Sequence, residues 1–251
     1  MNTKSVIIYS GGLDSTCLLH RIKKTDDVLA LIFSYGQKHS VEIDYAIDNC
    51  LDLGVNYKVL DISFFKDLAS TSALLGQHVE IPDARDVLGH AQPPTYVPNR
   101  NMMFLSIAAA AAESIKASNI YYGAAEVDTH SGHWDCSLDF LSYINTILGL
   151  NRELPVTVKA PYITFSKADI IKDGIKNGAN FKFTHTCYKG AEVACGKCTA
   201  CSSRIQGFLE AGYIDPKEYD IEVAGKIPWE QYNCKHIPIH PDQRHQPWTE
   251  L

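Results

Sequence analysis

A turn rich in glycine and serine lies close to the N-terminus and has the residue types that bind phosphate. Residues 10–15 read SGGLDS, between a strand-like apolar run at 5–9 and a helix-like run at 16–23. Because the first turn of a helix presents unpaired backbone N–H groups and the positive end of the helix dipole, such a turn binds anions. It is neither a Walker A loop, which needs Gly-Lys-Ser/Thr, nor a dinucleotide fingerprint, which needs a third glycine. An ordinary turn with Ser15 as a helix cap is the alternative.

Four cysteines cluster within fifteen residues in the second half of the chain. Cys187 is followed by the segment CGKCTAC, which supplies Cys195, Cys198 and Cys201. An all-cysteine set of four suits tetrahedral Zn²⁺ and leaves no open position, as in structural zinc sites. Disulfides are disfavoured by the tight spacing and an expected reducing compartment, and a redox CxxC pair would leave two cysteines unexplained. We therefore expect these four residues to bind zinc.

Three basic residues are expected in loops at the ends of strands. His39 belongs to the segment YGQKH, Arg100 precedes an alanine-rich helix, and Lys167 lies in the first turn of a capped helix. Guanidinium and ammonium groups in such positions suit phosphate. Each of them alone is more often an ordinary surface or packed side chain, but their grouping at strand ends favours a common site.

A long polar loop at 124–137 combines carboxylates with aromatic rings. Carboxylates accept hydrogen bonds from amino and ring N–H groups, and an indole stacks on a flat heterocycle. Cys136 would act as a nucleophile only beside a base. A solvated loop without a ligand is the alternative. The candidate residues for binding a heterocycle are Glu126, Asp128, His133, Trp134 and Asp135.

These motifs need a scaffold, and the chain alternates strand-like with helix-like segments. Strand patterns cover residues 5–9, 28–33, 57–62, 120–123 and 156–160. Helical patterns cover residues 16–23, 41–53, 101–116, 138–148 and 167 to about 178. The alternation predicts an α/β fold with a doubly wound, mostly parallel sheet and a ligand site at the carboxyl ends of its strands. The helix at 101–116 is apolar nearly all round and is expected to be buried.

Length, charge and hydropathy limit the class of protein. The 251 residues, net charge of −6 and 45% hydrophobic content suit a soluble α/β domain, alone or with a small added module. No apolar run reaches the roughly 18 residues of a membrane span, and the N-terminus shows no leader pattern. We expect a cytoplasmic protein with no membrane partner, whose eight cysteines are mostly thiols or metal ligands. The acidic balance argues against nucleic acid as a partner.

The SGGxDS turn resembles the PP-loop of the ATP pyrophosphatase superfamily, which has the adenine nucleotide alpha hydrolase-like fold. Its members cleave ATP between the α- and β-phosphates and hold pyrophosphate on this turn. The matching residues are Ser10, Gly11, Gly12, Asp14 and Ser15. The nucleotide contacts expected from this resemblance are Tyr9, Ser10, Gly11, Gly12, Leu13, Asp14, Ser15, Thr16, Tyr35, Gln37, His39, Arg100 and Lys167.

Further motifs carry a more specific resemblance, over about residues 5–213. The order YGQKH, VPNRN, DxxSGxxDC, KAD and TCY followed by CGKCxxC is similar to that of the 7-cyano-7-deazaguanine synthases, the QueC family. The resemblance implies a carbon–nitrogen ligase that activates 7-carboxy-7-deazaguanine with ATP and Mg²⁺, forms an amide with ammonia and converts it to the nitrile. It also implies catalytic roles for Asp14, Arg100 and Lys167, a deazaguanine site in the loop at 124–137, and Zn²⁺ on the four cysteines.

The chain departs from the family pattern in two motifs, and after residue 213 it is longer than compact family members need. Residues 131–137 read SGHWDCS where the family usually has SGYPDCR, and residues 97–101 read VPNRN where it has VPGRN. QueC-like proteins also occur in antiphage operons, including type IV CBASS systems, where the resemblance implies transfer of the deazaguanine to a protein amine. The acceptor is therefore left open between ammonia and a protein amine. A PP-loop tRNA-modifying enzyme and a zinc-stabilised nucleotide-binding module without turnover are further alternatives.

The motifs divide the chain into three parts. We expect a PP-loop ATP pyrophosphatase domain at 1–180, a zinc-binding helical segment at 181–213 and a C-terminal extension at 214–251. The extension is interpreted as a surface wrap or a dimer contact, and a homodimer is expected.

Overall fold

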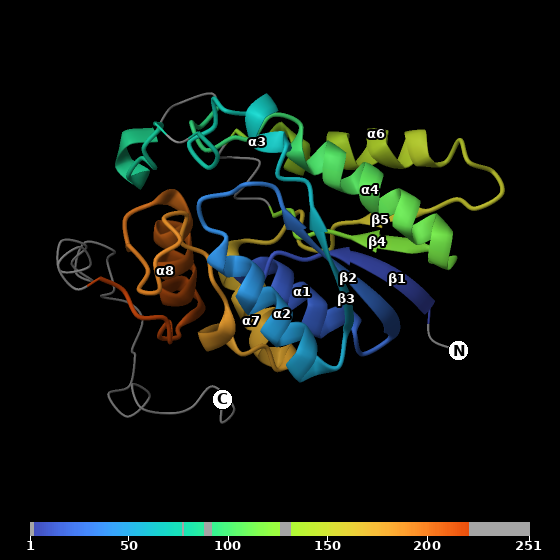
Figure 1. Cartoon of the computed structure of the whole chain (residues 1–251). Coiled ribbons are helices and arrows are strands. Elements are labelled where there is room, and N and C mark those ends of the chain that lie inside the picture. Colours follow the sequence, from blue (N-terminus) through green and yellow to red (C-terminus); the bar gives the residue numbers. More distant parts are fainter. Residues whose placement is uncertain (1–2, 77, 88–91, 126–131, 221–251) are drawn as a thin grey trace.

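The computed structural model describes residues 3–76, 78–87, 92–125 and 132–220, and it contains a five-stranded sheet (Figure 1). The strands are β1 (Thr3–Ile8), β2 (Asp26–Ser34), β3 (Asn56–Asp61), β4 (Asn119–Tyr121) and β5 (Thr157–Lys159). Their order is β3-β2-β1-β4-β5, and neighbouring strands in it run parallel. The chain reverses its winding direction between β1 and β4, which is where ligands bind in doubly wound sheets.

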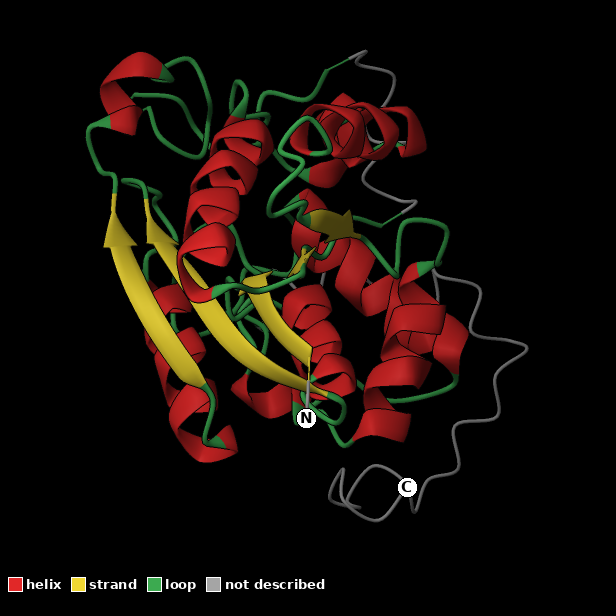
Figure 2. Ribbon diagram, turned by 90° about the vertical axis from the view of Figure 1, so that its right-hand side faces the viewer, coloured by secondary structure: helices red, strands yellow, loops and turns green. Residues whose placement is uncertain are grey.

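Helices cover both faces of this sheet. They are α1 (Leu13–Ile22), α2 (Val41–Leu53), α3 (Phe65–Leu68), α4 (Arg100–Ile115), α6 (Leu138–Leu148), α7 (Lys167–Asn177) and α8 (Thr199–Ala211), with short 3₁₀ turns at Ala84–Val87, Trp134–Cys136 and Phe181–Phe183. Figure 1 shows α4 and α6 on one face and α1, α2 and α7 on the other, and Figure 2 shows the sheet lying between helices in a second view. On β2, Leu31 and Phe33 pack in the first core, whereas Ala30 and Ile32 pack in the second. The predicted α/β doubly wound fold is confirmed.

The alanine-rich helix α4 differs from the buried helix that its sequence predicted. Phe104, Leu105 and Ala108 are buried against the sheet, but the opposite side is exposed at Met102 and Ser106. Alanine fits a buried or an exposed position equally well, so a helix rich in it shows little amphipathic contrast even when only one side is covered. The hydrophobic pattern of the sequence therefore could not predict which side of α4 is exposed.

Small residues bring α1, α7 and α8 into close contact. A Cβ on Gly174 of α7 would lie 2.4 Å from Cys17 Sγ of α1, and a Cβ on Gly207 of α8 would lie 2.3 Å from Lys167 Cγ of α7. Only glycine leaves room for these approaches. The expected capping box of α7 is present, because Ser166 and Asp169 bond each other's backbone N–H. Together these contacts fix the position of Lys167.

The stability of this packing should depend on pH through His20 of α1, which is only 7% exposed. Burial, aided by Lys23 and Lys24, lowers the pKa of His20 from 6.5 to about 4, while the Asn177 backbone and Asp52 act in the opposite direction. The unfolded chain therefore binds one more proton between these pH values, and stability falls as pH falls through this window. The free energy of unfolding should fall between pH 7 and pH 4.5 in the wild type. In His20→Gln we expect this fall to be smaller by about 2 kcal/mol, measured by urea titrations at both pH values. An identical pH slope in the variant would contradict this.

Candidate active site

The turn between β1 and α1 is held open toward the carboxyl end of the sheet. Gly11 has a φ of +76°, and a Cβ there would lie 2.6 Å from the Glu42 carbonyl oxygen of α2, so glycine is required on both grounds. The Ser10 hydroxyl accepts from the Gly12 N–H at 3.2 Å and lies 3.1 Å from the Ser15 hydroxyl. The turn is thus a preorganised loop that opens a helix, as anion binding requires.

A cavity of about 500 Å³ lies over this turn. The expected nucleotide and substrate residues that line it are Tyr9, Ser10, Gly12, Leu13, Asp14, Ser15, Tyr35, His39, Arg100, His133 and Lys167. Those that do not line it are Gly11, Thr16, Gln37, Trp134 and Asp135. Glu126 and Asp128 lie outside the described residues. The cavity therefore collects the basic side chains that sequence placed on separate loops.

Asp14 and Lys167 meet at the base of the cavity, although 153 positions separate them in the chain. Lys167 Nζ donates to both carboxylate oxygens of Asp14 at 2.7 Å. Each side chain comes from the first turn of its helix, α1 and α7. The pair places one positive and one negative group beside the glycine turn, where phosphate oxygens and a hard cation can each find a partner.

Arg100 reaches the cavity from the first residue of α4. Its Nη1 donates to the Tyr35 hydroxyl at 3.5 Å, and the guanidinium lies 6.0 Å from the centre of that ring. Burial opposes its charge, but Tyr35 and Asp135 more than offset this and raise the pKa of Arg100, so the group stays cationic. The preceding Asn99 has a φ of +54°. Asparagine is among the few residues besides glycine that accept this conformation, which explains how VPNRN can replace VPGRN.

The segment around His133, which departs most from the family pattern, has some residues that line the cavity and others that do not. His133 lines the cavity, whereas Trp134 donates from Nε1 to the Tyr96 hydroxyl at 2.9 Å and packs edge-on against Phe140. Asp135 is 2% exposed. Trp134 therefore contacts Tyr96 and Phe140 and is not among the residues that line the cavity, and its stacking on a heterocycle stays a prediction.

Several functional candidates were missed by sequence reasoning. Glu42 of α2 lines the cavity and lies 3.4 Å from His39 Nε2, and Gln37 Nε2 also donates to it at 3.2 Å. Tyr188 lines the same wall, with its ring 5.7 Å from that of His39. The short spacing between His39 and Glu42 was a usable signal, because the two residues lie in one turn at the start of α2, which the bond from the Glu42 N–H to the His39 carbonyl closes at 3.0 Å.

His185 was also missed, although it stands two residues before the first cysteine of the cluster. Its backbone N–H donates to the Gly11 carbonyl at 3.1 Å, and its Nε2 lies 2.9 Å from the Cys187 carbonyl. Burial lowers the pKa of His185 to about 4, so the ring is neutral near pH 7. This loop connects the glycine turn directly to the cysteine cluster.

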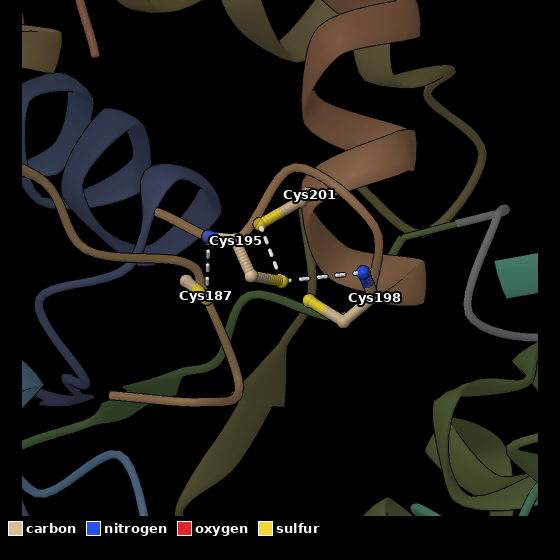
Figure 3. Close-up of side chains that lie close together, drawn as sticks. All are labelled: Cys187, Cys195, Cys198 and Cys201. Carbon is tan, nitrogen blue, oxygen red and sulfur yellow. Dashed lines mark hydrogen bonds between the residues drawn. The ribbon is translucent and has the colours of Figure 1, made fainter. Parts of the chain in front are cut away.

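The four cysteine sulfurs converge in the structure (Figure 3). Their Sγ atoms lie within 4.8 Å of one another, and those of Cys195 and Cys201 are 4.0 Å apart. Four thiolates at about 2.3 Å from a tetrahedral metal would lie about 3.8 Å from each other, so the set fits one ion with little adjustment. Hydrogen bonds from the three other thiols hold the pKa of Cys195 well below its usual range. The cluster can therefore hold a metal ion, as expected.

A buried ion pair ties the cysteine segment to the rest of the fold. Arg204 of α8 is 2% exposed and donates to both oxygens of Asp215, at 2.7 and 2.8 Å. It also donates to the hydroxyls of Thr184 and Thr186, at 2.7 and 3.2 Å. These contacts fix both ends of the loop that carries His185 over the glycine turn.

Comparison with known proteins decides the family. The family described as "Queuosine biosynthesis protein QueC" matches residues 4–212. This chain belongs to the QueC family. The 7-cyano-7-deazaguanine synthase of Alteromonas mediterranea is 42% identical over 225 residues, covering 88% of this chain and all of the relative. That of Caldicellulosiruptor bescii is 41% identical over 221 residues, covering 88% of this chain and 99% of the relative.

The QueC assignment confirms the family expected from the motifs, and with it an ATP-using enzyme of the PP-loop type. Among solved structures, the NMN synthetase of Francisella tularensis aligns with 95% of this QueC-family chain and 87% of its own, with a TM-score of 0.49 and 12% identity. Within the described part of the chain, no helix has the length and apolar character needed to cross a membrane.

Proposed function

We propose that this QueC-family enzyme converts 7-carboxy-7-deazaguanine to 7-cyano-7-deazaguanine, using ATP and ammonia. The supporting observation is the convergence of the glycine turn, Lys167 and Arg100 on one cavity, in a chain similar over its matched length to proteins named for that product. A cavity of about 500 Å³ is within the usual range for sites of small ligands.

The first step is activation of the carboxylate. Direct attack of ammonia on the carboxylate would have to expel oxide, which is a very poor leaving group. One carboxylate oxygen therefore first attacks the α-phosphorus of ATP, the bond to the β-phosphate oxygen breaks, and pyrophosphate leaves. Lys167, Arg100 and the N–H groups of the glycine turn stabilise the negative charge that develops on the phosphates. No protein nucleophile is needed, and we assign none to Cys136.

The donor groups of the cavity fit Mg²⁺. Mg²⁺ prefers carboxylate and phosphate oxygens, and Asp14 presents a carboxylate on the glycine turn itself. We propose that Asp14 holds this ion, which would neutralise phosphate charge, and that Lys167 then turns to the phosphates. The four cysteines would hold Zn²⁺, whose role with four thiolates and no open position is structural.

The second step delivers nitrogen. Ammonia attacks the acyl carbon, loses a proton, and AMP leaves to give the amide. The amide oxygen then attacks the α-phosphorus of a second ATP, the bond to the β-phosphate oxygen breaks, and pyrophosphate leaves. Departure of that oxygen with AMP and loss of the two remaining N–H protons give the nitrile. An amide nitrogen that already carries a protein carbon cannot follow this path to a neutral nitrile, so an enzyme that uses a protein amine would stop after one ATP.

We propose ammonia as the acceptor and a homodimer as the assembly, with the PP-loop domain, zinc segment and C-terminal extension divided as expected from sequence. We place deazaguanine recognition on the side of the cavity lined by His133 and Cys136. A tRNA substrate receives no support from the acidic composition.

Reconstitution tests the proposed reaction. We expect purified protein with 7-carboxy-7-deazaguanine, ATP, Mg²⁺ and ammonium to form the nitrile, which mass spectrometry detects. Two AMP and two pyrophosphate should be released for each nitrile formed. The control omits ammonium, and no nitrile should then form. Nitrile absent in the complete mixture, together with a deazaguanine-sized mass gained by a partner protein that is added in place of ammonium, would move the acceptor to a protein amine. Absence of carboxylate-dependent pyrophosphate release would overturn the ligase itself.

A further inference from the structure

The outer side of α6 carries large apolar side chains that no described residue covers. Tyr143 and Ile147 are 70% and 60% exposed, and Leu150 in the following turn is 77% exposed. Their spacing places them on one face, and Leu138 at the start of the helix adds a further apolar side chain at 58% exposure. A contiguous apolar surface of this kind marks an interaction site more often than a solvated face.

The neighbouring helix α4 extends this surface. Its exposed positions are Met102, Ser106, Ala110 and Ser114. The two helices share one hydrophobic core, and Asn151 after α6 donates to Glu113 of α4 at 3.0 Å. We call the outer sides of these two helices the α4–α6 face.

The α4–α6 face is nearly free of charge. Among the exposed positions of these two helices, both of which the structure describes in full, Asp139 is the one charged side chain. By contrast, the exposed positions of α7 are Asp169, Lys172 and Lys176. A helix that faces water permanently carries charged residues on its exposed side, as α7 does. Depletion of charge is instead characteristic of the centre of interfaces.

The adjacent sheet edge is closed to pairing with another chain. Val158 of the edge strand β5 has both backbone groups bonded to the Asn145 side chain of α6, at 2.8 and 3.0 Å. A sheet edge blocked in this way cannot add a strand from a partner. Association on this side of the molecule would therefore be helix against helix.

We propose that the α4–α6 face is the contact between two copies of this chain. A two-fold interface must be self-complementary, with each residue facing its counterpart across the axis. Antiparallel packing of α6 on a second α6 places Tyr143 opposite the partner's Ile147. The same arrangement brings Asp139, at one end of the face, to the partner's Arg152 at the other end, so the acidic and basic ends match.

This interface makes the proposed homodimer specific, and it does not depend on which reaction the enzyme performs. Stable interfaces bury about 800 Å² on each partner, so both helices contribute. The contact also has a place relative to the site, because α6 begins directly after the Trp134–Cys136 turn and α4 begins at Arg100. The second copy would thus buttress two walls of the cavity from outside.

Sedimentation equilibrium of the full chain tests the interface. We expect a mass of about twice 27.9 kDa for the wild type at micromolar concentration. Ile147→Glu should raise the dimer dissociation constant at least about 30-fold, because a carboxylate would be buried without a partner. Leu51→Glu is the matched control, since Leu51 lies on α2 with 64% exposure and should not change the mass. Circular dichroism checks that both variants keep their helix content.

A charge reversal separates this geometry from other modes of association. Asp139→Arg and Arg152→Asp should each weaken the dimer, and the double variant should restore it. A monomeric wild type, or a dimer that Ile147→Glu leaves intact, would overturn the proposal. Failure of the double variant to recover would overturn the antiparallel arrangement. These measurements use no substrate, so they remain informative even if the nitrile assay fails.

Discussion

Replacing Lys167 by alanine should lower kcat/KM for pyrophosphate release about 1,000-fold. In the structure, the Lys167 ammonium bonds both oxygens of Asp14 at 2.7 Å beside the glycine turn. Under the proposed mechanism Lys167 turns from Asp14 to the phosphates, so removing it takes one positive charge from the phosphate site. This loss raises the energy of a transition state in which negative charge grows on the phosphates. The measurement is pyrophosphate release with the deazaguanine carboxylate at saturating Mg²⁺.

Lys172→Ala is the control for this prediction. Lys172 lies on the same helix, but it is exposed and does not line the cavity. Its loss removes the same charge from the chain and should leave pyrophosphate release within about twofold of the wild type. Thermal melting of both variants separates loss of the site from loss of the fold. Pyrophosphate release by Lys167→Ala within about tenfold of the wild type would contradict a role at the phosphates.

Sequence predicted the parts of the site that depend on local signals. The glycine turn, the capping box that opens α7 and the close spacing of the cysteines are all defined within a few residues, so their chemistry could be read without the fold. Arg100 and Lys167 were placed correctly at helix starts because the helical pattern at 101–116 and the capping box at 166–169 are local signals. A common site for them was expected because parallel strands bring all their carboxyl ends to one edge. In the folded chain, the sheet topology brings these residues together around one cavity.

The features of the site that could not be predicted from the sequence depend on contacts between distant segments. The bond between Asp14 and Lys167 joins two helices, α1 and α7, that approach closely where Gly174 leaves room for Cys17. His185 bonds the glycine turn from a loop whose Thr184 and Thr186 are held by Arg204, twenty and eighteen positions further along the chain. The exposed side of α4 was missed since alanine fits either environment. In each case the deciding interaction spans positions that no local pattern connects.

Loss of the cysteine site should produce the second large effect. We expect Cys201→Ser to abolish zinc binding and to lower the melting temperature by at least about 10 °C, because a structural metal contributes directly to folding free energy. Zinc is measured per chain by atomic emission, with one equivalent expected in the wild type. Cys50→Ala is the matched control, because Cys50 is also fully buried but lies in the core beyond the cluster. It should lose some stability and keep its zinc.

The same variant should also lose activity, and the reason is the loop that joins the two sites. Cys187 follows His185 by two residues, and the His185 N–H bonds the Gly11 carbonyl at 3.1 Å. Thr186 and Tyr188 of the same loop line the cavity. If the metal fixes this loop, Cys201→Ser must slow pyrophosphate release at temperatures where the sheet is still folded. Normal release by a zinc-free variant below its melting temperature would separate the two sites and show that the cysteine segment stabilises the chain without supporting the cavity.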